Sequence, residues 1–164
     1  MQTPICVFCA KTNTLCGNCD KKIKEGTLSQ FDVELSKYLY DKFGELDLEY
    51  VSSFLAKDMV VLFFNGNIGP IVGKAGRGAL EIGRILGNGK RVKIINLKND
   101  VKKIISDIIY PVTLVGINSV FSGDGEVSKI RFSRKDMARI PFEINSMEKI
   151  LSKLLNKKIA IVFE

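Results

Sequence analysis

All four cysteines of this 164-residue chain lie within its first 19 residues, in two CxxC pairs, Cys6–Cys9 and Cys16–Cys19. A CxxC pair lets the backbone bend so that both sulfurs face one ion, and Gly17 eases the second bend. Four thiolates without histidine suit tetrahedral Zn²⁺ in a closed structural site, while an iron–sulfur cluster or rubredoxin-like iron is the alternative metal chemistry. Two disulfides are less suited to a cytosolic chain. The spacing predicts a zinc site with the ligands Cys6, Cys9, Cys16 and Cys19.

We predict that residues 1–28 comprise a four-cysteine zinc knuckle and its joint to the next unit, a polar stretch that begins at Lys21. The first 20 residues are too few to bury a core, so the metal should supply about 10 kcal/mol of folding free energy. The short loop between the pairs predicts a knuckle that packs on its neighbour. A redox motif would need one CxxC to open a helix after a strand, and the sequence predicts neither element here.

The segment Gly73-Lys-Ala-Gly76 is a second place where residue types and spacing could do chemistry. Two glycines let the backbone approach a ligand closely, and Lys74 and Arg77 place positive charge beside them. Residues 65–98 contain seven basic residues and one acidic residue, Glu81, in a chain of formal net charge +7. This combination favours a polyanion as the partner. A solvated basic surface and a plain turn between helices are the alternatives.

Several enzyme classes are excluded by composition, because the chain contains no histidine. Ser-His, Cys-His and His-ligated metal chemistry are therefore absent. The GKAG segment lacks the GxxxxGK[ST] frame of a P-loop, and no carboxylate pair accompanies it. We predict a protein that is not an enzyme and has no small-molecule substrate.

Apolar residues make up 46% of the chain, which is ample for a packed core. No apolar run approaches the roughly 18 residues needed to span a bilayer. The first residues, Met-Gln-Thr-Pro-Ile-Cys, lack the basic and apolar regions of a secretory signal. We predict a cytoplasmic protein with no membrane partner.

Hydrophobic periodicity predicts a helix, two strands, two helices and a strand between residues 29 and 98. Thr27 or Ser29 can cap the first helix and Gly44 can end it. The helix that follows the GKAG segment is predicted to pack in the core through four residues: Ala79, Leu80, Ile82 and Gly83. The predicted elements are residues 31–43, Leu48–Leu55, Met59–Phe64, Ile68–Val72, Arg77–Leu86 and Arg91–Asn96.

The same order of elements recurs at an offset of about 67 residues between residues 99 and 164. In this alignment, Pro141-Phe-Glu-Ile144 lies opposite the GKAG segment, with no glycine and with an acid. We predict that the second copy has lost phosphate binding and is structural. The alternative is an altered binding surface, because Arg131, Arg134, Lys135 and Arg139 still give this copy local positive charge. The predicted elements are Val101–Ile109 capped by Asn99 or Asp100, Val112–Phe121, Val127–Phe132, Asp136–Ile140, Ser146–Leu155 and Lys158–Phe163.

The order helix, strand, strand, helix, GxxG, helix, strand resembles the type II KH fold. The expected fold class is therefore α+β, with a zinc knuckle (1–28) and two tandem type II KH-like units (29–98 and 99–164), the second with a degenerate GxxG loop. The resemblance implies that single-stranded RNA lies in a groove that holds about four nucleotides. The residues it implies for RNA binding are Ile71, Gly73, Lys74, Ala75, Gly76, Arg77, Lys90 and Arg91.

Three segments together resemble an archaeal NusA-like KH-domain family with an N-terminal four-cysteine zinc knuckle: Pro4–Cys9, Ile71–Arg77 and Lys158–Glu164. The resemblance implies RNA binding in transcription elongation or termination, with RNA polymerase as a protein partner. The chain has no room for the polymerase-binding and OB-fold domains of bacterial NusA. The alternative is a ribosome-associated or ribosome-assembly factor, because type II KH units and zinc knuckles also occur there.

Overall fold

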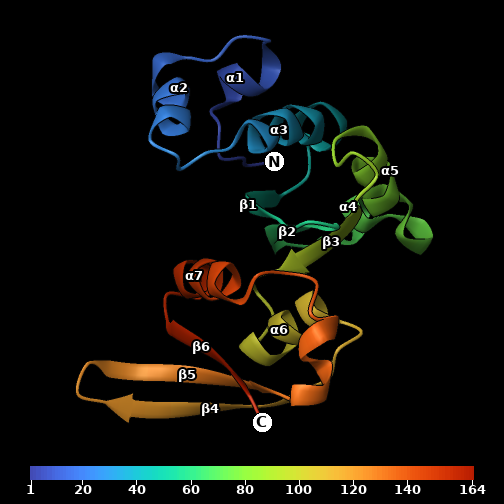
Figure 1. The fold of residues 1–164 in the computed structure, drawn as a ribbon. Coiled ribbons are helices and arrows are strands. Elements are labelled where there is room, and N and C mark those ends of the chain that lie inside the picture. Colours follow the sequence, from blue (N-terminus) through green and yellow to red (C-terminus); the bar gives the residue numbers. More distant parts are fainter. The chain divides into compact units, whose positions relative to one another are not determined.

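The structure is a computed structural model that describes all 164 residues (Figure 1). It is a mixed α+β protein with two three-stranded sheets and a cluster of cysteines near its N-terminus. Contacts divide the chain into two compact units, one of Met1–Ser53 with Val60–Lys98 and the other of Phe54–Met59 with Asn99–Glu164. None of the helices has the length and apolar character needed to span a lipid bilayer.

The first unit contains the elements that the periodicity predicts between residues 29 and 98, in the predicted order. Its sheet has the strand order β1-β2-β3. The elements are α3 (Gln30–Phe43), β1 (Leu48–Leu55), β2 (Met59–Gly66), α4 (Gly69–Val72), the 3₁₀ helix η1 (Lys74–Gly76), α5 (Arg77–Ile85) and β3 (Arg91–Asn96).

The N-terminal segment differs from the prediction, because each CxxC pair opens a helix. Cys6 is the N-cap of α1 (Val7–Lys11), and Cys16 is the N-cap of α2 (Gly17–Lys24). Helix α2 therefore takes up part of the predicted polar joint. Both helices are too short to show apolar periodicity, and helices of this length are marginal in isolation. Their packing around the cysteines, which the sequence pattern does not reveal, stabilises them.

A capping box at Ser29 starts α3, so that Ser29, and not Thr27, is the cap of this helix. The Ser29 hydroxyl accepts the Asp32 amide at 3.0 Å, and the Asp32 carboxylate accepts the Ser29 amide at 3.2 Å. The same carboxylate accepts the hydroxyls of buried Tyr50 and of Ser53 from β1. Burial, reinforced by the Asp32 charge, raises the pKa of Tyr50. One carboxylate thus links the helix start to the sheet.

The core of the first unit lies between its sheet and its helices α3, α4 and α5. Alternate residues of β2 face this core. Leu35 and Leu39 of α3 and Ile71 of α4 are completely buried there. The β2 residues that belong to the same cluster are Val60, Leu62 and Phe64.

Helix α5 lies unusually close to its neighbours because glycines face them. A Cβ at Gly78 would lie 1.9 Å from the Ile71 carbonyl oxygen, and one at Gly83 would lie 2.6 Å from the Lys90 carbonyl oxygen. Gly83 therefore has the predicted packing role. The prediction for Leu80 is wrong, since its side chain is 72% exposed. With Gly78, Ile82 and Gly83 facing inward, the helical period turns Leu80 to the opposite face.

The second unit repeats the helix–strand–strand arrangement with a second three-stranded sheet. Strands β4 and β5 pair antiparallel, and β5 and β6 pair parallel, in the order β4-β5-β6. Strand β4 begins two residues later than predicted, and the predicted short helix is a 3₁₀ helix. Asp100 caps α6. The elements are α6 (Val101–Ile109), β4 (Leu114–Ser122), β5 (Gly125–Phe132), η2 (Arg134–Arg139), α7 (Ile144–Leu155) and β6 (Lys158–Phe163).

The two sheets differ at their first strands, each of which lies at a sheet edge. Gln2 forms a bridge to Glu49 that adds backbone hydrogen bonds to the free side of β1. No such bridge covers β4, whose residues Leu114–Ser122 carry no charge. Near the hairpin tip, Phe121 is 79% exposed. The outer edge of β4 is thus an unpaired strand edge.

Candidate functional site

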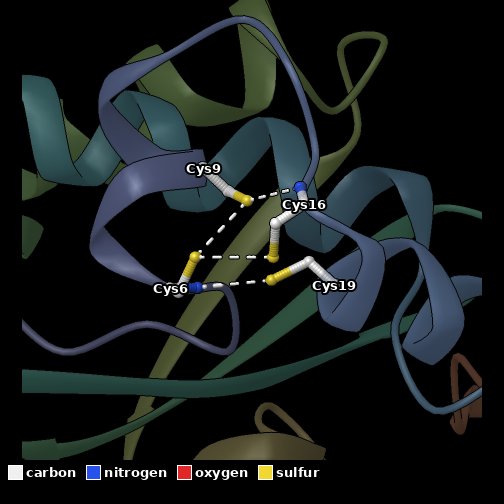
Figure 2. A group of neighbouring side chains, drawn as sticks. All are labelled: Cys6, Cys9, Cys16 and Cys19. Atoms are coloured by element: carbon white, nitrogen blue, oxygen red, sulfur yellow. Dashed lines mark hydrogen bonds between the residues drawn. The ribbon is translucent and has the colours of Figure 1, made fainter.

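The four cysteine sulfurs converge on one point, as the CxxC spacing predicts (Figure 2). All four Sγ atoms lie within 4.8 Å of one another. The Cys6 sulfur is 3.4 Å from that of Cys9 and 3.8 Å from that of Cys16. Ligands about 2.3 Å from a tetrahedral zinc lie about 3.8 Å apart, whereas a disulfide requires about 2.05 Å. All four cysteines are free, so the cluster can hold a metal ion and contains no disulfide.

Backbone amides connect the two knuckles in a reciprocal way. The Cys6 amide donates to the Cys19 sulfur at 3.4 Å, and the Cys16 amide donates to the Cys9 sulfur at 3.0 Å. The first cysteine of each pair therefore binds the last cysteine of the other pair, as Figure 2 shows. Amide donors stabilise negative charge on sulfur, which is the form that binds metal.

The ionisation of the thiols depends on their burial. Cys9 is completely buried, and burial raises the pKa of its thiol to about 12. Burial also raises the pKa of Cys19, whereas the Cys19 amide lowers the pKa of Cys16 to about 7. Two thiols are thus difficult to ionise in the protein alone. A cation between the sulfurs would offset this desolvation, so the donor set fits a metal ion.

The knuckle packs on its neighbour, as predicted from its short middle loop. Cys9 and Cys19 share a small core with residues that precede and begin α3. On the outer side, Val7 and Phe8 are 53% and 59% exposed. The buried members of this core are Ile5, Cys9, Ala10, Cys19, Leu28 and Val33.

The GKAG loop joins α4 to α5 with a backbone that turns sharply. Gly73 has φ 72° and ψ 173°, Ala75 has φ 53° and ψ 31°, and Gly76 has φ 74° and ψ 12°. Three of the four residues thus have positive φ, a region that L side chains rarely adopt. The Gly76 amide donates to the Gly73 carbonyl at 3.2 Å. The Arg77 amide donates to the Lys74 carbonyl, and Lys74 and Ala75 are exposed.

Charge around the loop is more positive than the sequence alone shows. Glu81, the one acid of residues 65–98, accepts Lys42 from α3 at 2.7 Å. The contact lowers the pKa of Glu81 and raises that of Lys42. Both partners are partly exposed, so the pair is screened and adds little stability. Its local effect is to neutralise the acid nearest to Arg77 and Arg84.

The residues that the KH resemblance implies for RNA binding fall into three places. Gly73–Arg77 lie together on the loop and at the start of α5. Ile71 is completely buried and supports the loop from the core. Lys90 and Arg91 lie beside the last turn of α5, where the Lys90 carbonyl approaches Gly83.

Two exposed residues of the basic segment were missed as candidates, Leu80 and Arg84. Together with Arg77 they follow the spacing i, i+3, i+7, which places them on one face of α5. That spacing was visible in the sequence. It predicts core packing for Leu80, because the position of an apolar residue in a short helix does not reveal which side the sheet covers.

The counterpart of the loop in the second unit has an ordinary backbone. Pro141–Glu143 link η2 to α7, and no residue of this link has a positive φ. Glu143 is the N-cap of α7, and its carboxylate accepts the Ser146 hydroxyl at 2.9 Å. The close backbone approach that glycines allow at Gly73 and Gly76 is therefore absent here.

No family model and no curated protein matches the chain. Among solved structures that resemble it is the crystal structure of APE1850, at 16% identity and a TM-score of 0.49. The likeness covers 78% of this chain and 94% of that chain. It is too distant to assign a family or a function.

Proposed function

We propose that the protein binds single-stranded RNA through the GKAG loop of its first unit, in the manner of a KH domain. The observation that carries this proposal is the backbone of the loop, which turns through positive φ at Gly73, Ala75 and Gly76. The side chain of Ala75 is a single methyl group, which leaves its backbone open to a ligand. Lys74 and Arg77 are exposed on either side.

The loop offers two kinds of group to a phosphate. The turn uses the amides of Gly76 and Arg77 for its own hydrogen bonds, whereas those of Lys74 and Ala75 take no part in it. Backbone amides and basic side chains are common donors to phosphate oxygens in nucleic-acid complexes. The pairing of Glu81 with Lys42 leaves no unneutralised acid between Arg77 and Arg84.

We further propose that the protein is related to the NusA-like factors of transcription elongation or termination, with Zn²⁺ in its cysteine cluster. The support is the order of elements in both units and the position of the cysteine cluster ahead of the first. Four thiolates near tetrahedral spacing suit zinc. The metal is structural in this proposal, because all four ligands are cysteines and none is left for a substrate.

A charge-reversal variant tests RNA binding. Lys74→Asp with Ala75→Asp should reduce the affinity for a labelled single-stranded RNA more than 100-fold, measured by fluorescence anisotropy, because carboxylates would face phosphate. The matched control is Asn145→Asp with Lys149→Asp on α7, which changes the charge equally at two exposed positions. Unchanged circular dichroism establishes folding. Equal affinities of the two variants would contradict the proposal.

A further inference from the structure

We propose that the RNA strand continues from the GKAG loop along the outer face of α5 to a second basic position, Arg84, in the last turn of that helix. This inference rests on the proposed function and lengthens the surface that the RNA contacts. Arg84 and Leu80 have no role in the predicted four-nucleotide groove. Both are exposed, Leu80 by 72%.

The geometry of α5 arranges these residues in a line. A rise of 1.5 Å per residue places Arg77 and Arg84 about 10 Å apart along the helix axis, with Leu80 between them. Arg77, Leu80, Glu81 and Arg84 line a shallow groove of about 350 Å³. The inward glycines, Gly78 and Gly83, hold the opposite face against the rest of the unit. The outer face of α5 is therefore an exposed surface and not part of the core.

The last turn of α5, which carries Arg84, is held in place by the backbone. A Cβ on Gly83 would be 2.6 Å from the Lys90 carbonyl oxygen, so the chain entering β3 is pressed onto this turn. Exposed Arg84 follows Gly83 directly. The GKAG loop and Arg84 therefore lie at the two ends of one helix.

The charge of the face selects a polyanion. Arg77 lies in the first turn of α5, where no acidic residue balances the positive end of the helix dipole. Glu81 is the one acid on the face, and Lys42 neutralises it. Leu80 offers apolar contact between the two charged ends, where a nucleobase can pack. A single strand that reaches both ends must be longer than the four nucleotides of one groove.

Affinity as a function of RNA length tests this path. We would measure binding of labelled four- and eight-nucleotide oligouridylates by anisotropy over a range of salt. The wild type should bind the longer RNA about tenfold more tightly. Arg84→Ala should remove most of this gain and leave the four-nucleotide affinity unchanged, because Arg84 is not among the residues of the four-nucleotide groove. Its salt slope on the longer RNA should fall by about 0.7, for one lost phosphate contact.

The matched control is Lys149→Ala, which removes one exposed charge from the second unit. The path is overturned if this control and the α5 variant bind the longer RNA equally, or if the wild type shows no gain with length. In both cases the loop variant Lys74→Asp/Ala75→Asp still shows whether the proposed function holds. A wild type that binds neither RNA overturns the proposed function and the path together.

Discussion

The two units share an order of elements but differ at the loop between their last two helical segments. In the first unit the loop has three residues with positive φ and carries Lys74. In the second, extended residues lead into α7, and Glu143 occupies the N-cap position without a side-chain hydrogen bond to the helix backbone. The comparison shows that the same order of helices and strands can carry two different loop backbones. In the proposed function, the backbone of these few residues decides whether a phosphate can approach.

The units also differ in what supports the first helix. In the first unit, α3 is anchored by Asp32, whose carboxylate accepts Ser29, Tyr50 and Ser53, and by the cysteine cluster. In the second unit, Asp100 caps α6 by accepting the Lys103 amide. In the first unit the polar connections between helix and sheet therefore come from the first helix, whereas in the second unit they come from α7, where Ser152 and Glu148 accept the β6 amides of Ile159 and Ile161. Changes to the connections of Asp32 should affect the first unit and leave the second intact.

Metal removal should produce the largest difference between the units. If the cysteine cluster holds a structural ion, as proposed, a chelator should release one metal ion per chain and unfold residues 1–28, because such an ion would supply about 10 kcal/mol to this segment. Hydrogen exchange followed by mass spectrometry should show lost protection in α1 and α2 and unchanged protection in α6 and α7. Restored protection after Zn²⁺ addition is the control. A metal-free protein with full N-terminal protection would rule out a structural metal.

A methyl group at Gly78 should come next in size. Gly78→Ala would place Cβ 1.9 Å from the Ile71 carbonyl oxygen, so α4 and α5 must separate. We expect a loss of about 3 kcal/mol or more in the free energy of unfolding, measured with urea. Gly17→Ala is the matched control, because nothing lies within 4 Å of that position. Similar stability of the two variants would show that α5 does not pack so closely.

The first unit and the cysteine core contain much that the sequence predicts, and the exceptions have physical causes. The apolar spacing of Leu35 and Leu39 and the run Met59–Phe64 predict α3 and β2, since long regular patterns reflect burial. Helices α1 and α2 escape prediction because they depend on contacts around the cysteines. Ala75 is another exception, because a positive φ at alanine is imposed by the flanking glycines and helices.

The candidate sites divide in the same way. The CxxC spacing predicts that the four sulfurs converge, because the backbone of each pair can bend so that both of its sulfurs face one ion. The outer face of α5 is not predictable from periodicity alone. Its exposure follows from the inward position of Gly78 and Gly83. The sequence does not reveal that position, because it depends on where Ile71 and Lys90 lie in the fold.

Loss of one hydroxyl in the first unit should have an intermediate effect. Tyr50→Phe removes a donor to the Asp32 carboxylate inside the core and should lower the free energy of unfolding by about 1–3 kcal/mol. Because the pKa of Tyr50 is raised in the folded protein, its contribution to stability is complete below pH 10 and declines at higher pH. Unfolding at pH 8 and pH 11 should therefore show a smaller difference between variant and wild type at pH 11. An equal difference at both would contradict the role of Tyr50.

The smallest effect is expected at the second loop. Glu143→Gln removes a negative charge from the segment opposite GKAG and should change RNA affinity less than twofold. The reason is that no residue there has the positive φ of the first loop. Anisotropy with the eight-nucleotide RNA measures this, with thermal unfolding as a check on the N-cap. A tenfold gain would show that the second unit binds RNA and would end the contrast between the loops.

The close crossing at Gly78 has a consequence for how mutational screens of this protein should be interpreted. Under the proposed function, a screen that selects only for RNA capture would find substitutions at Gly78 as harmful as those at Gly73, although Gly78 faces the Ile71 carbonyl. Measuring cellular abundance in parallel separates the two cases. Substitutions at Gly78 should deplete the protein itself, whereas those at Lys74 should leave abundance normal and reduce only capture.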